Sequence, residues 1–149
     1  MKNNSVSLHR IFQAAPEKVF RAFADVTAYA SWIPPYGFIC TVQQSDFKEG
    51  GQFKMTFINF STGNGHSFGG TYTEIREGQF LKYIEHFDNP ALQGEMTTTV
   101  SFGKVSCGTE IRIEQTGIPE QIPAEMCYLG WQESLDKLKR LVEPEIPDA

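Results

Sequence analysis

The sequence has no long hydrophobic run. No stretch approaches the roughly 18 apolar residues that a membrane-spanning helix needs, and residues 1–14 contain no continuous apolar segment typical of a signal peptide. Basic residues are also scarce, because 13 Lys and Arg stand against 18 Asp and Glu, which gives a net charge of −5. Since nucleic acids and anionic membranes are bound by clustered positive charge, we expect no nucleic-acid partner, no membrane insertion and a cytoplasmic location.

Metal-binding and redox motifs are missing as well. The three cysteines, Cys40, Cys107 and Cys127, are widely spaced and form no Cys-x-x-Cys pair, and the three histidines are scattered. We therefore expect free thiols, no metal site and no cofactor. Ser134 and Lys137 match the Ser-x-x-Lys spacing of penicillin-binding enzymes, but the companion motifs of those enzymes are absent. We expect this pair on the solvent side of a helix, with no catalytic role.

Aromatic residues, in contrast, are abundant. The chain holds 12 Phe, 5 Tyr and 2 Trp, which is 13% of 149 residues, within an ordinary overall content of 40% hydrophobic and 21% charged residues. That length is typical of one domain, so we expect a single domain over residues 1–149 with its core at about residues 8–143. The aromatic side chains either fill this core or line a cavity within it, and the pattern alone leaves both interpretations open.

The hydrophobic periodicity predicts one strand, two short helices, about six strands and a long final helix. Pro16 marks the start of the first helix, and Thr27 is expected to cap the second, which Pro34 and Pro35 end. A polar, Gly-rich stretch at residues 61–67 is predicted to be a mobile loop. The predicted strands cover residues 7–13, 38–42, 53–57, 70–75, 80–87, 97–102 and 109–116.

The final helix, at about residues 123–142, carries one apolar stripe. Its members follow at intervals of 4, 4, 3 and 4 residues: Cys127, Trp131, Leu135, Leu138 and Val142. Acid-before-base pairs at i,i+4, Glu133–Lys137 and Asp136–Arg140, are expected on the other side. Since this helix is long enough to cover the apolar face of an antiparallel sheet, we predict an α+β fold with a curved sheet closed on one helix.

Several segments resemble those of a known superfamily. The matching stretches occur in order over about residues 8–143, at 15–23, 31–34, 47–53, 70–75, 108–111 and, above all, 130–138 (GWQESLDKL). Together they are similar to START-like domains of the helix-grip (Bet v 1-like) superfamily, in the branch named for activator of heat-shock protein 90 ATPase homologues. The resemblance implies a curved antiparallel sheet of about six to seven strands wrapped on the C-terminal helix, with two short helices after the first strand.

Glu85 is the polar residue whose predicted position has the clearest chemical consequence. Neighbours on a strand point to opposite faces, so if Leu81 and Tyr83 point inward, Glu85 does too and His86 does not. A carboxyl group there would be desolvated and its pKa raised, so that it could bind a polar ligand head or act as an acid. The alternative is a residue at the end of a strand that reaches solvent at the mouth of a cavity.

The predicted cavity lies between the sheet and the C-terminal helix. Tyr72, Tyr83 and Gln115 would supply inward polar groups among the aromatic rings, and Trp32 and the 61–67 loop would border the entrance. The complete set of predicted cavity residues is Trp32, Phe53, Phe57, Tyr72, Tyr83, Glu85, Phe102, Gln115, Cys127, Trp131 and Leu135.

Three functions follow from the sequence and the resemblance. The leading hypothesis is a protein that binds an apolar or aromatic small molecule in this cavity. The second is a chaperone-cofactor-like interaction module, which the name of the resembling family suggests. The third is a cyclase or hydratase that uses Glu85, His86 or Tyr83 as acid or base. We favour a binding protein over an enzyme, and we assign no catalytic residue.

Overall fold

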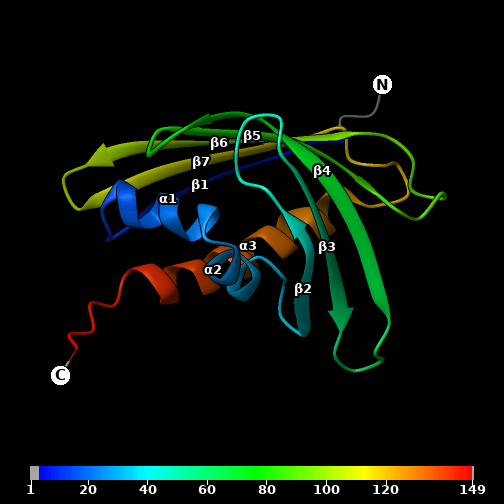
Figure 1. Ribbon diagram of the computed structural model, residues 1–149, viewed down its shortest axis with the longest axis horizontal. Helices are drawn as coiled ribbons and strands as arrows, with labels where there is room; N and C mark the ends of the chain where they lie inside the picture. Colours follow the sequence, from blue (N-terminus) through cyan, green and yellow to red (C-terminus); the bar gives the residue numbers. More distant parts are fainter. Residues whose placement is uncertain (1–3, 149) are drawn as a thin grey trace.

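The computed structural model describes residues 4–148 and has an α+β architecture (Figure 1). In chain order the elements are β1 (Val6–Phe12), α1 (Pro16–Ala24), α2 (Val26–Trp32), β2 (Phe38–Ser45), β3 (Gln52–Asn59), β4 (Gly65–Arg76), β5 (Phe80–Phe87), β6 (Met96–Val105), β7 (Gly108–Thr116) and α3 (Ala124–Val142). The predicted order of elements is confirmed, since six strands follow the two short helices and precede the long one.

The strands form one antiparallel sheet in the order β1-β7-β6-β5-β4-β3-β2. Strands β2 to β7 are neighbours in sequence and in space, as short turns dictate, whereas β1 pairs with the last strand, with Val6 opposite Gln115. The sheet is strongly curved, and all three helices lie on its concave side (Figure 1). The predicted helix-grip fold is therefore confirmed.

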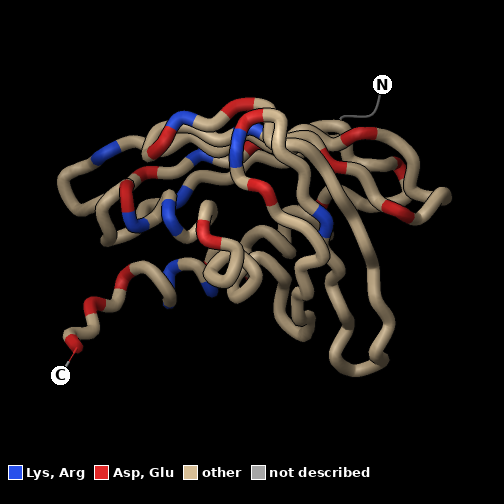
Figure 2. Tube along the Cα trace, in the orientation of Figure 1, with Lys and Arg blue, Asp and Glu red and all other residues tan. Residues whose placement is uncertain are grey.

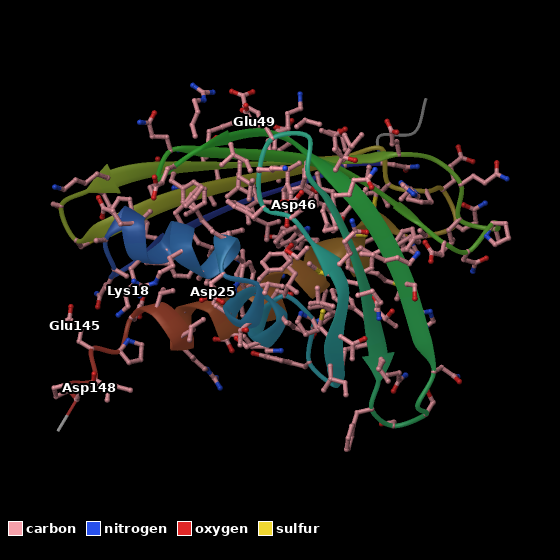
Figure 3. All side chains as sticks on the ribbon, viewed as in Figure 1. Lys18, Asp25, Asp46, Glu49, Glu145 and Asp148 are labelled. Atoms are coloured by element: carbon pink, nitrogen blue, oxygen red, sulfur yellow. The ribbon has the colours of Figure 1, made fainter. Side chains whose placement is uncertain are left out.

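The two short helices begin and end for identifiable reasons. Pro16 occupies the first position of α1 and Glu17 its first turn, and Val19, Phe20 and Phe23 are buried. The cap of α2 differs from the prediction: the carboxylate of Asp25 accepts the backbone N–H groups of residues 27 and 28 at 2.9 and 3.1 Å, so Thr27 is not the capping residue. Figure 3 labels Asp25 at the junction of α1 and α2.

The predicted loop at residues 61–67 is wrong in its second half. Strand β4 begins at Gly65, and Ser67 pairs with Thr56 of β3, where the two hydroxyls lie 2.8 Å apart. The polar sequence misled the prediction because this end of the hairpin is exposed on both faces. The turn itself is tight, with the side chain of Asn59 accepting the backbone N–H of Ser61 at 2.9 Å.

Helix α3 buries four of the five predicted stripe residues, Trp131, Leu135, Leu138 and Val142, while Cys127 is half-buried. The prediction that Ser134 faces solvent is wrong, because this side chain is buried and its hydroxyl donates to the backbone carbonyl of Ile33 at 2.6 Å. The Asp136–Arg140 ion pair forms as expected. The predicted Glu133–Lys137 pair does not.

Glu133 and Lys137 instead bind the segment that links α2 to β2. Lys137 donates to the carbonyl of Pro34 at 2.9 Å, and Glu133 accepts the backbone N–H of Tyr36 at 3.1 Å. The main backbone contacts of α3 are accordingly with β1, α1 and α2. The space between α3 and the central strands is therefore spanned by side chains.

Charged residues are unevenly distributed along the chain. Residues 26–45 and 55–73 contain no Lys, Arg, Asp or Glu, so α2, β2 and most of the β3–β4 hairpin appear as one uncoloured region in Figure 2. Lys, Arg, Asp and Glu are spread over the rest of the chain (Figure 2). Among the described residues, no helix has the length and apolar character to cross a membrane.

Candidate ligand-binding site

Aromatic side chains on the concave face form two groups. The first, which we call the sealed cluster, lies between α1, α2 and β6 and consists of Phe20, Phe23, Trp32 and Phe102. Their exposed fractions are 7% or less, and the Trp32 indole donates to the carbonyl of Ala22 at 2.8 Å. Because its rings meet edge to face and its one polar group is paired, this cluster is a dry core.

The second group contains polar aromatic residues and lies farther along the sheet. The ring of Phe53 contacts Tyr72 and Tyr83 at centroid distances of 5.0 and 5.7 Å. The hydroxyl of Tyr83 lies 3.4 Å from that of Tyr29, which α2 brings to the same place. Phe47 connects the two groups through rings 4.9 Å from Tyr72 and 5.9 Å from Phe20.

Beside the second group is a chain of buried polar side chains, which we call the polar cluster: Glu85, Thr98, Gln115 and Trp131. The Trp131 indole donates to Gln115 Oε1 at 3.2 Å. The Gln115 amide in turn donates to Thr98 Oγ1 at 3.1 Å and, more weakly, to Glu85 Oε1 at 3.4 Å. The cluster joins β5, β6 and β7 to α3.

The pattern of hydrogen bonds fixes the orientation of the Gln115 amide. An indole N–H can only donate, so the oxygen of Gln115 must face Trp131 and its nitrogen must face Glu85. Strand register supports this arrangement, because Gln115 pairs with Thr98 on β6 and lies on the buried face with Ile113. Glu85 therefore acts as the acceptor at the end of a chain of donors.

The carboxyl group of Glu85 is only half satisfied. Its side chain is buried, with 8% of the residue exposed, and Oε1 accepts from Gln115, while Oε2 accepts from no described residue. Every fully buried side-chain nitrogen or oxygen of the described residues has a partner, so Oε2 must border accessible space. Burial away from water raises the pKa of Glu85 to about 7.

The other titratable groups around Glu85 are uncharged at neutral pH. Burial raises the pKa of Tyr72 to about 12 and holds the pKa values of Tyr29 and Tyr83 well above their ordinary value. The pKa of the Cys127 thiol on α3 is raised by burial and, to a smaller degree, by the negative charge of Glu85. Glu85 is therefore the one group in these surroundings whose charge changes near neutral pH.

Gly70, a residue without a side chain, leaves space for the ring of Phe53 beside Glu85. Gly70 of β4 pairs with Glu85 across the sheet, and a Cβ atom at Gly70 would lie 2.7 Å from the ring of Phe53 and would collide with the carbonyl of Ile84. The missing side chain lets the Phe53 ring lie over β4 next to the carboxyl group.

Burial decreases along the concave face beyond the polar cluster. Met55, Leu81 and Tyr83 are 1–2% exposed, whereas inward-facing apolar residues nearer the β3–β4 hairpin are half-buried. We call this region the open end; it consists of Cys40, Phe57 and Phe87. Cys127 of α3, whose thiol is close enough to be affected by the charge of Glu85, is likewise half-buried. Cys40 pairs with Phe57, whose ring packs on Phe68, which pairs in turn with Phe87.

The structure thus brings together six of the predicted cavity residues around Glu85: Phe53, Tyr72, Tyr83, Gln115, Cys127 and Trp131. Phe57 lies at the open end, and Leu135 is buried in the stripe of α3. Trp32 and Phe102 lie in the sealed cluster instead, so Trp32 does not border an opening.

Two residues of the site are additions to the sequence analysis. Thr98 alternates with the buried Val100 and Phe102 on β6, so the same period-2 argument that found Glu85 could have found it. Tyr29 lies one helical turn before Trp32, but the contact of its hydroxyl with Tyr83 depends on how α2 packs, which no local pattern reveals.

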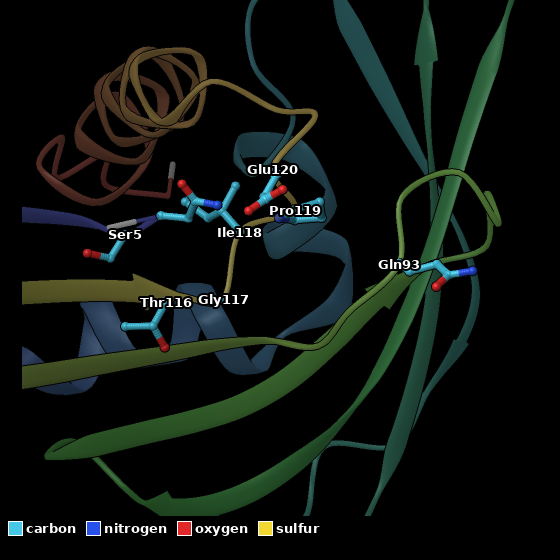
Figure 4. Close-up of a pocket in the computed structure, with 8 residues that line it drawn as sticks. Ser5, Gln93, Thr116, Gly117, Ile118, Pro119 and Glu120 are labelled. Atoms are coloured by element: carbon cyan, nitrogen blue, oxygen red, sulfur yellow. The ribbon is translucent and has the colours of Figure 1, made fainter. Parts of the chain in front are cut away.

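Two surface pockets are lined by residues other than those of the polar cluster. One, of about 360 Å³, is bordered by residues of the N-terminus, the β5–β6 loop and the β7–α3 connection, among them Gln93, Ile118 and Glu120 (Figure 4). The other, of about 490 Å³, lies over α1 and is lined by Phe20, Phe47 and Ile75 with charged groups around them. Within the described residues, no three His, Cys, Asp or Glu side chains are placed to bind a metal ion.

The fold and the polar cluster define a helix-grip protein of the START-like class. The chain matches the family described as "Activator of Hsp90 ATPase homolog 1-like protein" over residues 13–143. It therefore belongs to that family. A search of the curated proteins finds no match.

Solved structures agree with this assignment. Protein CV1439 from Chromobacterium violaceum is 48% identical to the chain, with a TM-score of 0.94 over 95% of this chain and 99% of the other. A protein from Arthrobacter aurescens is 21% identical, with a TM-score of 0.81 over 93% and 87% of the two chains. One from Rhodobacter sphaeroides is 18% identical, with a TM-score of 0.79 over 92% and 90%. The last two show likeness of fold alone.

Proposed function

We propose that the protein binds a small apolar or aromatic molecule between α3 and the concave face of the sheet. The observation that carries the proposal is the unpartnered Oε2 atom of Glu85. Oε2 lies at the edge of accessible space while most of Glu85 is buried, so a ligand that donates a hydrogen bond could reach this atom without breaking an existing contact. The rings of Phe53 and Tyr83 next to it supply an apolar wall.

The open end is the route by which such a ligand would enter. Its residues are apolar yet half-buried, and those from β2 and β3 lie in segments that carry no charged residue between positions 38 and 45 or 55 and 73. Lys137 of α3 is a nearby cation, close enough to Cys40 to act on its thiol. A largely apolar approach suits a ligand that leaves water with little polar surface. The chaperone-cofactor alternative depends on the family description alone, and no contact within residues 4–148 bears on it.

Fluorescence titration tests the proposal. N-phenyl-1-naphthylamine, an aromatic probe that is uncharged at neutral pH, should show a saturable increase in fluorescence with one-site binding. Cys127→Trp should weaken this binding by about tenfold or more, because the larger side chain would occupy space beside Glu85, whose charge acts on the Cys127 thiol. The matched control is Cys107→Trp, at the exposed turn between β6 and β7, which should bind the probe as the wild type does.

Two results would contradict the proposal. One is the absence of saturable probe binding by the wild-type protein. The other is equal probe affinity for the Cys127→Trp and Cys107→Trp variants, which would place the probe elsewhere on the surface.

A further inference from the structure

We propose that the ligand of this site is an organic cation: an aromatic or apolar molecule with a protonated amine or a related N–H group that binds the carboxylate of Glu85. The inference rests on the proposed function and specifies which ligands the cavity selects. It depends on the direction of the hydrogen bonds, on the charges that surround Glu85 and on the rings beside it.

The hydrogen bonds leave the ionised Glu85 carboxylate with a free acceptor atom. Trp131 can only donate, which turns the amide nitrogen of Gln115 toward Glu85. Both amide hydrogens are then directed to protein acceptors, at Glu85 and Thr98. The lone pairs of Oε2 remain, so a ligand that binds the carboxylate form of Glu85 has to donate a hydrogen bond.

The charges around Glu85 favour a positive donor over a neutral one. The polar side chains that face it come from every element packed against β5: Tyr29 of α2, Tyr72 of β4, Tyr83 of β5 itself, Thr98 of β6, Gln115 of β7, and Cys127 and Trp131 of α3. None of these is a cation. Lys137, on the same helix, is held by the carbonyl of Pro34, and no basic group contributes to the shift in the pKa of Glu85.

A carboxylate that lacks a cation in a low-dielectric site is poorly stabilised, and a ligand cation would supply the missing charge. An anionic ligand, such as a carboxylate or a phosphate ester, would be repelled by the same group and would find no basic partner there. Tyr29, Tyr83 and Trp131 lie around the polar cluster, so the aromatic body of the ligand would meet aromatic side chains. The site therefore discriminates by charge as well as by shape.

Proton release is a further consequence. Because burial sets the pKa of Glu85 to about 7, the free carboxyl is partly protonated at about pH 7. An ammonium group that binds there favours the carboxylate, so binding expels a fraction of a proton to the buffer. A neutral donor of the same shape stabilises the carboxylate less, so it expels a smaller fraction of a proton.

Three probes with one aromatic body test this inference by isothermal titration calorimetry: 1-naphthylmethylamine, 1-naphthalenemethanol and 1-naphthoic acid. At about pH 7 the amine should bind the wild-type protein about tenfold or more tighter than the alcohol, and the acid should bind weakest. The heat of amine binding should depend on the ionisation enthalpy of the buffer more steeply than the heat of alcohol binding does. This second measurement uses the wild-type protein and depends on no variant.

Glu85→Gln, which keeps the shape of the side chain, should abolish the preference for the amine and retain binding of the alcohol. His86→Gln is the matched control, because His86 is exposed on the other face of the same strand. If the alcohol binds as tightly as the amine, or the acid binds tightest, the cation inference is overturned while the binding function stands. If none of the three probes binds and N-phenyl-1-naphthylamine does not bind either, both proposals fail.

Discussion

The sealed cluster and the polar cluster lie on the same concave face, yet they differ in whether all of their polar groups have hydrogen-bond partners. Around Phe23 every ring contacts another ring, and the one polar group, the Trp32 indole, is paired with a backbone carbonyl. Around Glu85 the rings alternate with polar side chains, and one carboxyl oxygen has no partner. The difference teaches that an excess of aromatic residues does not by itself mark a cavity, whereas incomplete hydrogen bonding among them does.

The largest expected effect concerns the sealed cluster. Phe23→Ala should lower the free energy of unfolding by about 3–5 kcal/mol, because it removes a fully enclosed ring and leaves a void. Phe57→Ala, at the half-buried open end, should cost no more than about 2 kcal/mol, because water can occupy the space. Urea unfolding measures both values, and equal losses would mean that the two regions are packed alike.

The next effect is the pH dependence contributed by Glu85. Its pKa of about 7 in the folded protein lies above the ordinary value of 4.5, so the folded state holds a proton that the unfolded state has lost. Stability from this group is therefore complete below about pH 4.5 and declines as the pH rises to about 7, by about 3 kcal/mol.

Glu85→Gln should remove this decline, so the unfolding free energy of the variant minus that of the wild type should rise between about pH 4.5 and 7. Glu95→Gln, at an exposed position, serves as the control and should follow the wild-type curve. A difference curve for Glu85→Gln that is flat with pH would show that the carboxyl group is solvated.

A smaller effect tests whether the polar cluster acts as a unit. Gln115→Met should cost about 1–3 kcal/mol, because it leaves the Trp131 indole N–H buried without an acceptor. Trp131→Phe should cost less in the Gln115→Met background than in the wild type, with a coupling energy of about 1 kcal/mol. Additive losses in this double-mutant cycle would contradict the proposed chain of hydrogen bonds.

The smallest effect concerns the attachment of α3 to the α2–β2 link. Ser134→Ala removes the hydroxyl that donates to Ile33 and should cost about 1 kcal/mol in thermal or urea unfolding. Arg140→Gln, on the exposed side of the same helix, should change stability by less than about 0.5 kcal/mol, because it removes only the surface ion pair with Asp136. A larger loss for Arg140→Gln than for Ser134→Ala would place the anchoring contact on the outer face.

Most of the fold could be predicted from the sequence because its signals are local. The period-2 pattern over residues 80–87 coincides with β5, and the 4-4-3-4 stripe coincides with the buried face of α3. The exceptions have a common cause. Ser134, Glu133 and Lys137 were expected on the outer side of the helix, but the α2–β2 segment packs against that side, and no periodicity within α3 encodes a segment 100 residues away.

The candidate site shows the same division between features that local sequence patterns predict and features that depend on tertiary packing. By itself the sequence determined that Glu85 and Gln115 lie on the inward face of their strands, because alternation in a strand is a property of the backbone. Only the tertiary structure decided that the two meet, that Trp131 fixes the orientation of the Gln115 amide, and that Trp32 belongs to the dry core. Those outcomes depend on strand order, sheet curvature and the path of α3, which place residues far apart in the chain within hydrogen-bonding distance.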